Sequence, residues 1–74
     1  MLTVREAAAV VRELRQERGW TQNDLAERAS VSRSFIAELE TGKATVEAAK
    51  LLDVFQAFGF EFALRNRDTG VVRW

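Results

Sequence analysis

The side chains that could do chemistry in this chain are hydrogen-bonding groups rather than catalytic ones. The sequence has no histidine, no cysteine, no glycine-rich phosphate loop and no pair of carboxylates set apart from ordinary surface positions. These absences argue against acid–base catalysis, nucleophilic catalysis and most metal sites. We therefore expect no enzymatic activity, no cofactor and no metal. What remains are polar residues that could recognise a ligand by hydrogen bonding: Gln22, Arg33, Ser34 and Lys43.

The stretch that must position these residues, Thr21 to Glu40, has the pattern of two short helices separated by a tight turn. Thr21 and Asp24 have the spacing of a capping box at a helix N-terminus, and Ser32 can cap the second helix. The helical spacing of apolar residues is interrupted around Val31. Two helices joined by a turn of three or four residues, the second with a polar front, predict a helix-turn-helix.

The two predicted helices resemble the helix-turn-helix of the Xre/Cro/cI (lambda-repressor-like) DNA-binding family, over the residues TQNDLAERASVSRSFIAELETGK. The resemblance runs from about Val11 to about Phe58, and its pattern is Thr-Gln, Leu-Ala, Val-Ser and Ile-x-x-Leu-Glu-x-Gly-Lys. It implies that the second helix binds double-stranded DNA in a sequence-specific manner. The family often has glycine where this chain has Ser30, so we expect a positive φ and some strain at this residue.

The resemblance assigns roles to residues on and around the second helix. The outward front of that helix would read bases, and Arg33 has bidentate reach to guanine. Backbone N–H groups near Thr41 would help to hold phosphates. Phe35 is open between contact with a thymine methyl and packing on the neighbouring helix, and Arg28 is interpreted as solvated rather than as a phosphate contact. The base-reading residues are Ser32, Arg33, Ser34, Ala37 and Glu38, and the phosphate-binding residues are Gln22, Thr41 and Lys43.

One charged pair is expected inside the bundle. Arg15 lies one turn after Val11 on the inward stripe of the first helix, and Glu40 lies one turn after Ile36. A charge at the inner face is costly unless it is paired, and the family pairs residues at these two positions. We therefore expect a structural salt bridge between Arg15 and Glu40.

Length and charge limit the possibilities further. Seventy-four residues suit one domain with a small core, which oligomerisation would help to stabilise. Eleven Lys plus Arg balance eleven Asp plus Glu, so DNA binding would need a locally basic face instead of bulk charge. No apolar run reaches the ~20 residues of a membrane span, and the N-terminus lacks a signal-peptide core. We expect a cytoplasmic protein with no membrane partner.

Two further helices flank the motif. Apolar residues recur with helical spacing from Val4 to Arg18, with Thr3 as the N-cap. Thr45 is the expected N-cap of a last helix that runs to Phe58 and has an apolar band too wide for one packing surface. The predicted fold is an all-α, lambda-repressor-like bundle of four helices in residues 1–59, followed by a short β-strand and tail in residues 60–74.

The C-terminal residues carry a strand pattern. Apolar and polar residues alternate over the first half of Phe60 to Asn66, which is typical of a half-buried strand. Because a lone strand leaves its backbone groups unpaired, we expect Phe60 to Arg65 to pair with its symmetry mate in a two-fold homodimer. The contacts of this dimer would come from the outer face of the helix Val46 to Phe58 and from one face of the strand, which carries Phe60, Phe62 and Leu64.

The end of the chain allows two interpretations. A turn is expected at Arg67–Gly70, after which Val71 to Trp74 folds back as a hairpin arm or remains a loose tail. The strand segment also resembles that of HipB-like antitoxins, and this resemblance implies a second, protein partner.

These observations predict a repressor that binds a palindromic double-stranded DNA operator as a homodimer. The HipB-like resemblance implies an antitoxin that represses its own toxin–antitoxin operon and binds a kinase-type toxin protein. Two alternatives remain: a free-standing Xre-type repressor without a toxin, and a protein-interaction module that has lost DNA binding. A kinase-like reading frame beside the gene would favour the antitoxin.

Overall fold

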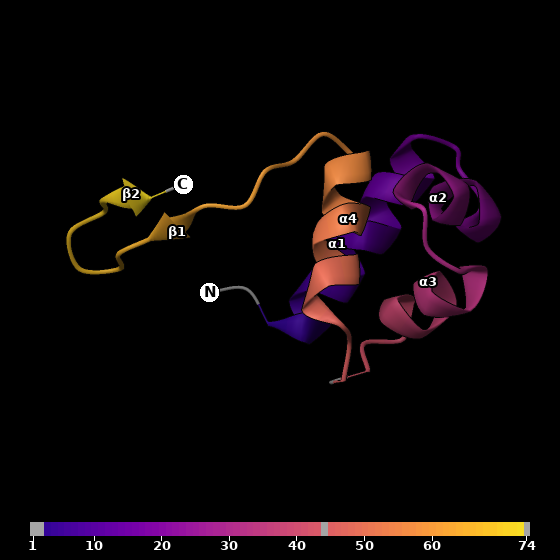
Figure 1. Cartoon of the computed structure of the whole chain (residues 1–74), viewed down its shortest axis with the longest axis horizontal. Helices are drawn as coiled ribbons and strands as arrows, with labels where there is room; N and C mark the ends of the chain where they lie inside the picture. Colours follow the sequence, from indigo (N-terminus) through magenta and orange to yellow (C-terminus); the bar gives the residue numbers. More distant parts are fainter. Residues whose placement is uncertain (1–2, 44, 74) are drawn as a thin grey trace.

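The computed structural model describes residues 3–43 and 45–73. Within these residues, helices make up the first part of the chain and a short hairpin makes up its end (Figure 1). The architecture is an all-α helix-turn-helix bundle with a small two-stranded element. The elements are α1 (Val4–Glu17), α2 (Gln22–Ala29), α3 (Arg33–Glu40), α4 (Ala48–Ala57), β1 (Leu64–Arg65) and β2 (Val72–Arg73).

Side-chain caps fix where the first three helices begin. Thr3 and Thr21 are the N-caps, as predicted, and each sits in a complete capping box, of which only the one at Thr21 was predicted. At the start of α2, the Thr21 hydroxyl accepts a hydrogen bond from the Asp24 N–H at 3.0 Å, and the Asp24 carboxylate accepts one from the Thr21 N–H at 2.9 Å. That backbone hydrogen bond, with the hydroxyl contact, lowers the pKa of Asp24. Ser32 caps α3 through the N–H of Phe35 at 3.0 Å.

The turn between α2 and α3 is closed by Ser30 in the left-handed conformation. Its φ of 57° and ψ of 41° confirm the expected positive φ. The Ser30 N–H donates to the Glu27 carbonyl at 3.3 Å, and the Val31 N–H donates to the Ala26 carbonyl at 3.0 Å. These two bonds satisfy carbonyls at the end of α2 and send the chain directly into α3. The turn therefore holds a serine in a conformation that glycine adopts more easily.

The core lies where α2 meets α3 and α4, and where α1 meets α3. Its largest fully buried side chains are contributed by all four helices, and Ala26 is buried beside them so that α2 can approach its neighbours closely. Each helix places apolar residues at three- and four-residue steps on the inner side. The fully buried set is Val11, Leu25, Ile36, Leu39 and Val54.

The start of α4 differs from the prediction. We expected Thr45 as its N-cap, but the helix begins at Ala48, and Glu47 occupies the N-cap position without a side-chain hydrogen bond. Residues 45–47 run without regular structure, and Val46 packs against the core. The partly buried Val46 gains apolar contacts from this irregular segment instead of from a helical turn.

The predicted strand from Phe60 to Arg65 is mostly wrong. Only Leu64–Arg65 is a strand, and it pairs with Val72–Arg73 of the same chain in an antiparallel hairpin. The hairpin interpretation of the tail is therefore confirmed, while Trp74 lies outside the described residues. Upstream of the hairpin, the Phe60 N–H donates to the Phe55 carbonyl at 3.0 Å and thus belongs to the end of α4.

The hairpin stands away from the helices. Figure 1 shows an extended segment leading from the end of α4 to β1, with β1, β2 and their turn on the far side of the bundle from α3. The Asn66 side chain accepts hydrogen bonds from the N–H groups of Asp68 and Thr69 and so orders the turn. We call residues 60–73 the arm; all of them are exposed.

No helix in the ranges 3–43 and 45–73 has both the length and the apolar composition needed to cross a membrane. In the same ranges, no three acidic side chains lie close enough together to hold a metal ion.

Candidate nucleic-acid interface

The outward front of α3 presents polar side chains on a rigid support. Ser32, Arg33, Ser34 and Glu38 are exposed, and Ala37 is half-buried. On the opposite side of the helix, the core holds α3 in place through two fully buried side chains. The front residues therefore sit on a fixed surface that a groove of nucleic acid could accept.

Arg33 is the cation on this front with the greatest freedom. Its position at the start of α3 places it next to Ser34, and among the described residues it takes part in no ion pair. The Ser32 hydroxyl, by contrast, already accepts the hydrogen bond from the Phe35 N–H that caps the helix. The guanidinium of Arg33 can thus donate two hydrogen bonds to one acceptor pair, whereas the Ser32 hydroxyl has a structural task as well.

The end of α3 carries a weak ion pair that the sequence analysis did not anticipate. The Lys43 ammonium lies 3.5 Å from the Glu38 carboxylate, and both side chains are more than half exposed. An exposed pair of this kind contributes about 1 kcal/mol or less to stability, so a phosphate could readily draw Lys43 away. Lys43 and Glu38 are therefore neighbours whose charges offset each other in the free protein.

Thr41 has little hydrogen-bonding capacity left for a phosphate. Its hydroxyl donates to the Glu38 carbonyl at 2.6 Å, and its N–H donates to the same carbonyl at 3.2 Å. The Gly42 N–H donates to the Leu39 carbonyl at 3.0 Å. These bonds close the C-terminus of α3, and Lys43 is the cation next to it in the chain.

An ion pair between Arg15 and Glu40 links α1 to α3. The Arg15 guanidinium makes two parallel hydrogen bonds to the carboxylate, from Nε to Oε2 at 2.7 Å and from Nη2 to Oε1 at 2.9 Å. The two side chains are only 14% and 6% exposed. The hydrogen bond to Glu40 raises the pKa of Arg15 above its usual value, burial opposes this change, and the charge attraction adds to it. The pair is bidentate and rigid.

Two more residues join this ion pair to the start of α2. Arg15 donates from Nη1 to the Trp20 carbonyl at 2.8 Å, and the Gln22 amide donates to the Glu40 carboxylate at 3.4 Å. Gln22, a candidate phosphate ligand, is thus held beside the end of α3. Its second amide N–H can still donate to another acceptor. The network fixes the position of α2 relative to α3 across the turn.

A cluster of aromatic rings and guanidinium groups, which the sequence analysis missed, joins the ends of α1, α2 and α4. The rings of Trp20 and Phe58 stack with centroids 5.4 Å apart, and the Arg18 guanidinium lies 5.2 Å from each. Arg18 also donates to the Phe58 carbonyl at 2.8 Å. Arg28 lies 4.3 Å from the Trp20 ring centroid, in contact with an aromatic face rather than merely solvated. No local pattern links Trp20 to a residue as distant in sequence as Phe58.

Phe35 packs on its neighbours. Its half-buried ring contacts the core, and the Lys50 ammonium of α4 lies 5.6 Å from the ring centroid. This geometry favours the packing interpretation of Phe35 over contact with a thymine methyl.

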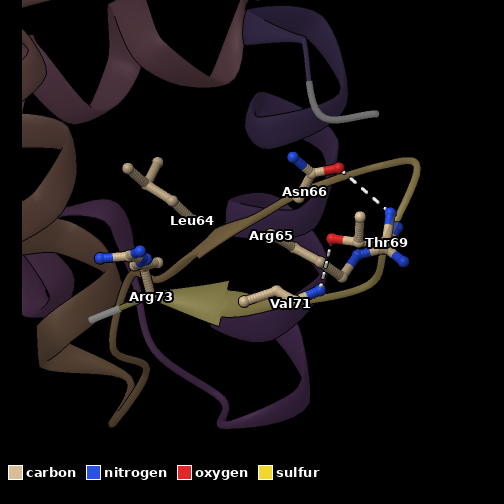
Figure 2. Close-up of a pocket in the computed structure, with 6 residues that line it drawn as sticks. All are labelled: Leu64, Arg65, Asn66, Thr69, Val71 and Arg73. Carbon is tan, nitrogen blue, oxygen red and sulfur yellow. Dashed lines mark hydrogen bonds between the residues drawn. The ribbon is translucent and has the colours of Figure 1, made fainter.

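The residues assigned to a dimer contact lie apart from this front. Phe60 and Phe62 are 49% and 42% exposed, and Leu64 in β1 is 78% exposed. The Phe62 ring meets the Phe55 ring edge to face at 5.3 Å. Figure 2 shows Leu64, Val71 and Arg73 around a shallow pocket of the hairpin. The structure therefore separates a polar front on α3 from an apolar surface on the arm.

Comparison with known proteins points to one family. The family described as "Helix-turn-helix domain" matches residues 6–67, which include most of α1 and extend through β1. An uncharacterized HTH-type transcriptional regulator, y4mF, of Sinorhizobium fredii is 40% identical over 57 residues, which make up 77% of this chain and 75% of that protein. The match includes the capped α2, the tight turn and the supported α3 described above. The chain belongs to the helix-turn-helix domain family.

Proposed function

We propose that this protein is a DNA-binding transcriptional regulator whose α3 enters the major groove of double-stranded DNA. The observation that carries the proposal is the front of α3: exposed Arg33 and Ser34 stand on a helix that the core and the ion pair of Arg15 and Glu40 hold rigidly. The similarity to a protein described as an HTH-type transcriptional regulator supports it. A repressor acting at an operator is the simplest form of such a regulator.

On the front of α3 and beside it, some side chains would contact bases and others would bind phosphates. Arg33 donates two hydrogen bonds to guanine, with the shorter side chains of Ser32, Ser34, Ala37 and Glu38 completing the surface that meets the bases. Lys43 and Gln22 bind phosphates on either side and set the register of the helix, and Thr41 contributes least because its hydrogens are already donated.

The operator would be a palindrome read by a two-fold dimer. A two-fold axis relates the two α3 helices, so the half-sites must lie about one helical turn, ~34 Å, apart on one side of the DNA. The exposed apolar arm supports a dimer, because such a surface is rarely left in water by a chain of this size.

Replacing Arg33 and Lys43 tests these roles. Arg33→Ala should weaken operator binding by roughly 1 to 3 kcal/mol and relax the preference at one base pair in each half-site. Lys43→Ala should weaken operator and scrambled duplex alike and reduce the salt slope by about one counterion per subunit. Arg67→Ala, which removes a cation from the hairpin turn, is the matched control. Titration at several salt concentrations measures all three.

Two outcomes would contradict the proposal. Equal loss of affinity for operator and scrambled duplex in Arg33→Ala would remove Arg33 from base reading. A wild-type protein that selects no fragment of its own promoter region would favour the alternative of a protein-interaction module that has lost DNA binding.

We further propose that the regulator is an antitoxin that represses its own operon and binds a kinase-type toxin. The arm favours this function, since it leaves an apolar surface exposed on the side of the bundle away from α3, and the resemblance to HipB-like antitoxins adds support. Co-expression with the product of the neighbouring gene, followed by co-purification, tests it. If no neighbouring kinase-like protein co-purifies, the antitoxin proposal fails, and operator binding would then favour a free-standing Xre-type repressor.

A further inference from the structure

Two apolar surfaces lie away from α3. One is an apolar hollow between the bundle and the start of the arm, lined by Val10 of α1, Phe55 of α4, and Phe60, Glu61 and Phe62 of the arm. On the hairpin, Leu64 and Val71 are 78% and 55% exposed. Neither surface is explained by DNA binding at α3.

The hairpin has one face suited to this hollow. Leu64 is paired with Arg73 across the two strands, and opposed residues share a face. The Asn66 N–H donates to the Val71 carbonyl at 2.8 Å, which places Val71 on that same face, next to Leu64 and Arg73 (Figure 2). The face thus combines two apolar side chains with one cation, while Arg65 and Val72 lie on the other face.

The hairpin is poorly placed to cover the hollow of its own chain. β1 begins only two residues after Phe62, whose ring lies on Phe55 with centroids 5.3 Å apart. Folding the hairpin back over the hollow would lift Phe62, one of its walls, away from Phe55. The extended course of the arm in Figure 1 instead points the hairpin away from the helices.

We propose that the Leu64–Val71 face of one copy docks on the apolar hollow of a second copy, and that the second copy returns the same contact around a two-fold axis. The charges fit this arrangement, because Arg73 on the docking face would meet Glu61 at the edge of the other copy's hollow. In such a dimer, the hairpin face and the hollow of each copy are both buried against the other copy. The inference deepens the dimer of the proposed function, and its geometry does not depend on DNA binding.

This dimer differs from a ribbon in which two copies of Phe60 to Arg65 pair side by side. In the structure, the Phe62 ring packs on Phe55, Phe60 lines the hollow, and β1 pairs with β2 through one of its two edges. Arm docking keeps all of these contacts and does not use the free edge of β1, which a ribbon would need.

Charge reversal tests the proposed pairing. Arg73→Glu and Glu61→Arg should each raise the dimer dissociation constant about tenfold or more, and the double variant should return it to within about threefold of the wild type. Arg67→Glu makes the same charge change in the hairpin turn, outside the pocket residues, and should have little effect. Sedimentation equilibrium without DNA measures the constants, and circular dichroism checks that the helices are unchanged. Single reversals without effect, or a double variant that is not restored, would overturn the pairing.

Engineered cysteines locate the contact, because the chain has none of its own. When Val10→Cys protein is mixed with Val71→Cys protein under oxidation, we expect a disulfide-linked heterodimer. A doubly substituted chain that forms only an internal disulfide would show that the hairpin folds back on its own bundle, and Leu64→Cys protein that links efficiently to itself would favour the ribbon. Either result overturns arm docking, as does a monomeric wild type.

The DNA-binding proposal is tested separately by these variants. A monomeric Arg73→Glu protein that keeps its base preference on a half-site would leave the role of Arg33 intact. If the wild type dimerises through the arm but selects no DNA, the proposed function is contradicted and the arm-docked dimer is still supported.

Discussion

The helical bundle and the arm differ in what holds each of them in place. In the bundle, three helices begin at side-chain caps, the core is closed by fully buried side chains, and an ion pair joins α1 to α3. In the arm, every described residue is exposed; a two-residue ladder and a hydrogen-bonded turn order the hairpin, and Phe60 and Phe62 contact Phe55 of α4. An isolated two-stranded hairpin is marginally stable in water. The bundle is thus held by side chains buried within one chain, while the described residues of the arm include no buried side chain.

A pair of leucine substitutions should give the largest contrast between the two regions. Leu25 is fully buried and Leu64 is 78% exposed. We expect Leu25→Ala to lower the free energy of unfolding by about 3 to 4 kcal/mol, because it leaves a cavity in the core. Leu64→Ala should change the stability of the monomer by less than about 0.5 kcal/mol. Urea unfolding at low protein concentration measures both, and equal losses would mean that the hairpin packs on its own bundle.

Removing one partner of the buried ion pair should have the next largest effect. Arg15→Ala leaves the Glu40 carboxylate, only 6% exposed, without its guanidinium. We expect a loss of about 2 to 3 kcal/mol, below the range for a fully buried pair because Arg15 is partly exposed. A double-mutant cycle with Glu40→Ala by thermal unfolding measures the coupling. Additive effects below 1 kcal/mol would show that the two side chains act independently.

A substitution in the strained turn between α2 and α3 should stabilise the bundle. Ser30 has φ 57°, a conformation that glycine reaches without the steric cost of a Cβ. Ser30→Gly should therefore raise the free energy of unfolding by about 0.5 to 1 kcal/mol, after the larger entropy of glycine in the unfolded chain is subtracted. Ser30→Ala keeps the Cβ and should show no such gain. A destabilised Ser30→Gly protein would mean that the serine side chain makes a needed contact.

The smallest expected effect concerns the cap of α2. The hydrogen bonds from Thr21 lower the pKa of Asp24 from its ordinary value of 3.8. The stabilisation is therefore present above pH ~4 and is lost as the pH falls through the lowered pKa. Asp24→Asn should be less stable than the wild type near neutral pH, and the difference should shrink in acid. Asp68→Asn in the arm is the control. Parallel unfolding curves at all pH values would contradict a role for the ionised carboxylate.

The sequence predicts the bundle well because its signals are local. The caps at Thr3, Thr21 and Ser32, and the positive φ at Ser30, each depend on residues within one turn of the chain. The inward placement of Arg15 and Glu40 follows from helical spacing, and the family resemblance supplied their pairing. The polar front of α3 was predictable for the same reason, since burial of its opposite side fixes which residues point outward.

The sequence predicts the arm and the start of α4 less well because competing contacts decide them. Alternation between Phe60 and Leu64 suggests a strand, but it cannot show that Phe60 hydrogen bonds to the end of α4 or that Phe62 meets Phe55. Thr45 is a good cap by residue type, but α4 begins at Ala48, and Val46 packs against the core from the irregular segment before it. The partners of Lys43 and Arg28 depend on side-chain positions that no spacing rule gives.

The stack of Trp20 on Phe58 makes the fluorescence of Trp20 a reporter of the helical bundle. Its ring contacts Phe58 just after α4, and Arg28 of α2 covers it, so three segments must be assembled for its surroundings to exist. Trp20 and Trp74 are the two tryptophans of the sequence, and Trp74→Phe leaves a single fluorophore. The emission of Trp20 then follows closure of the helices without a signal from the end of the chain. Folding of the bundle can thus be followed separately from any change at the end of the chain.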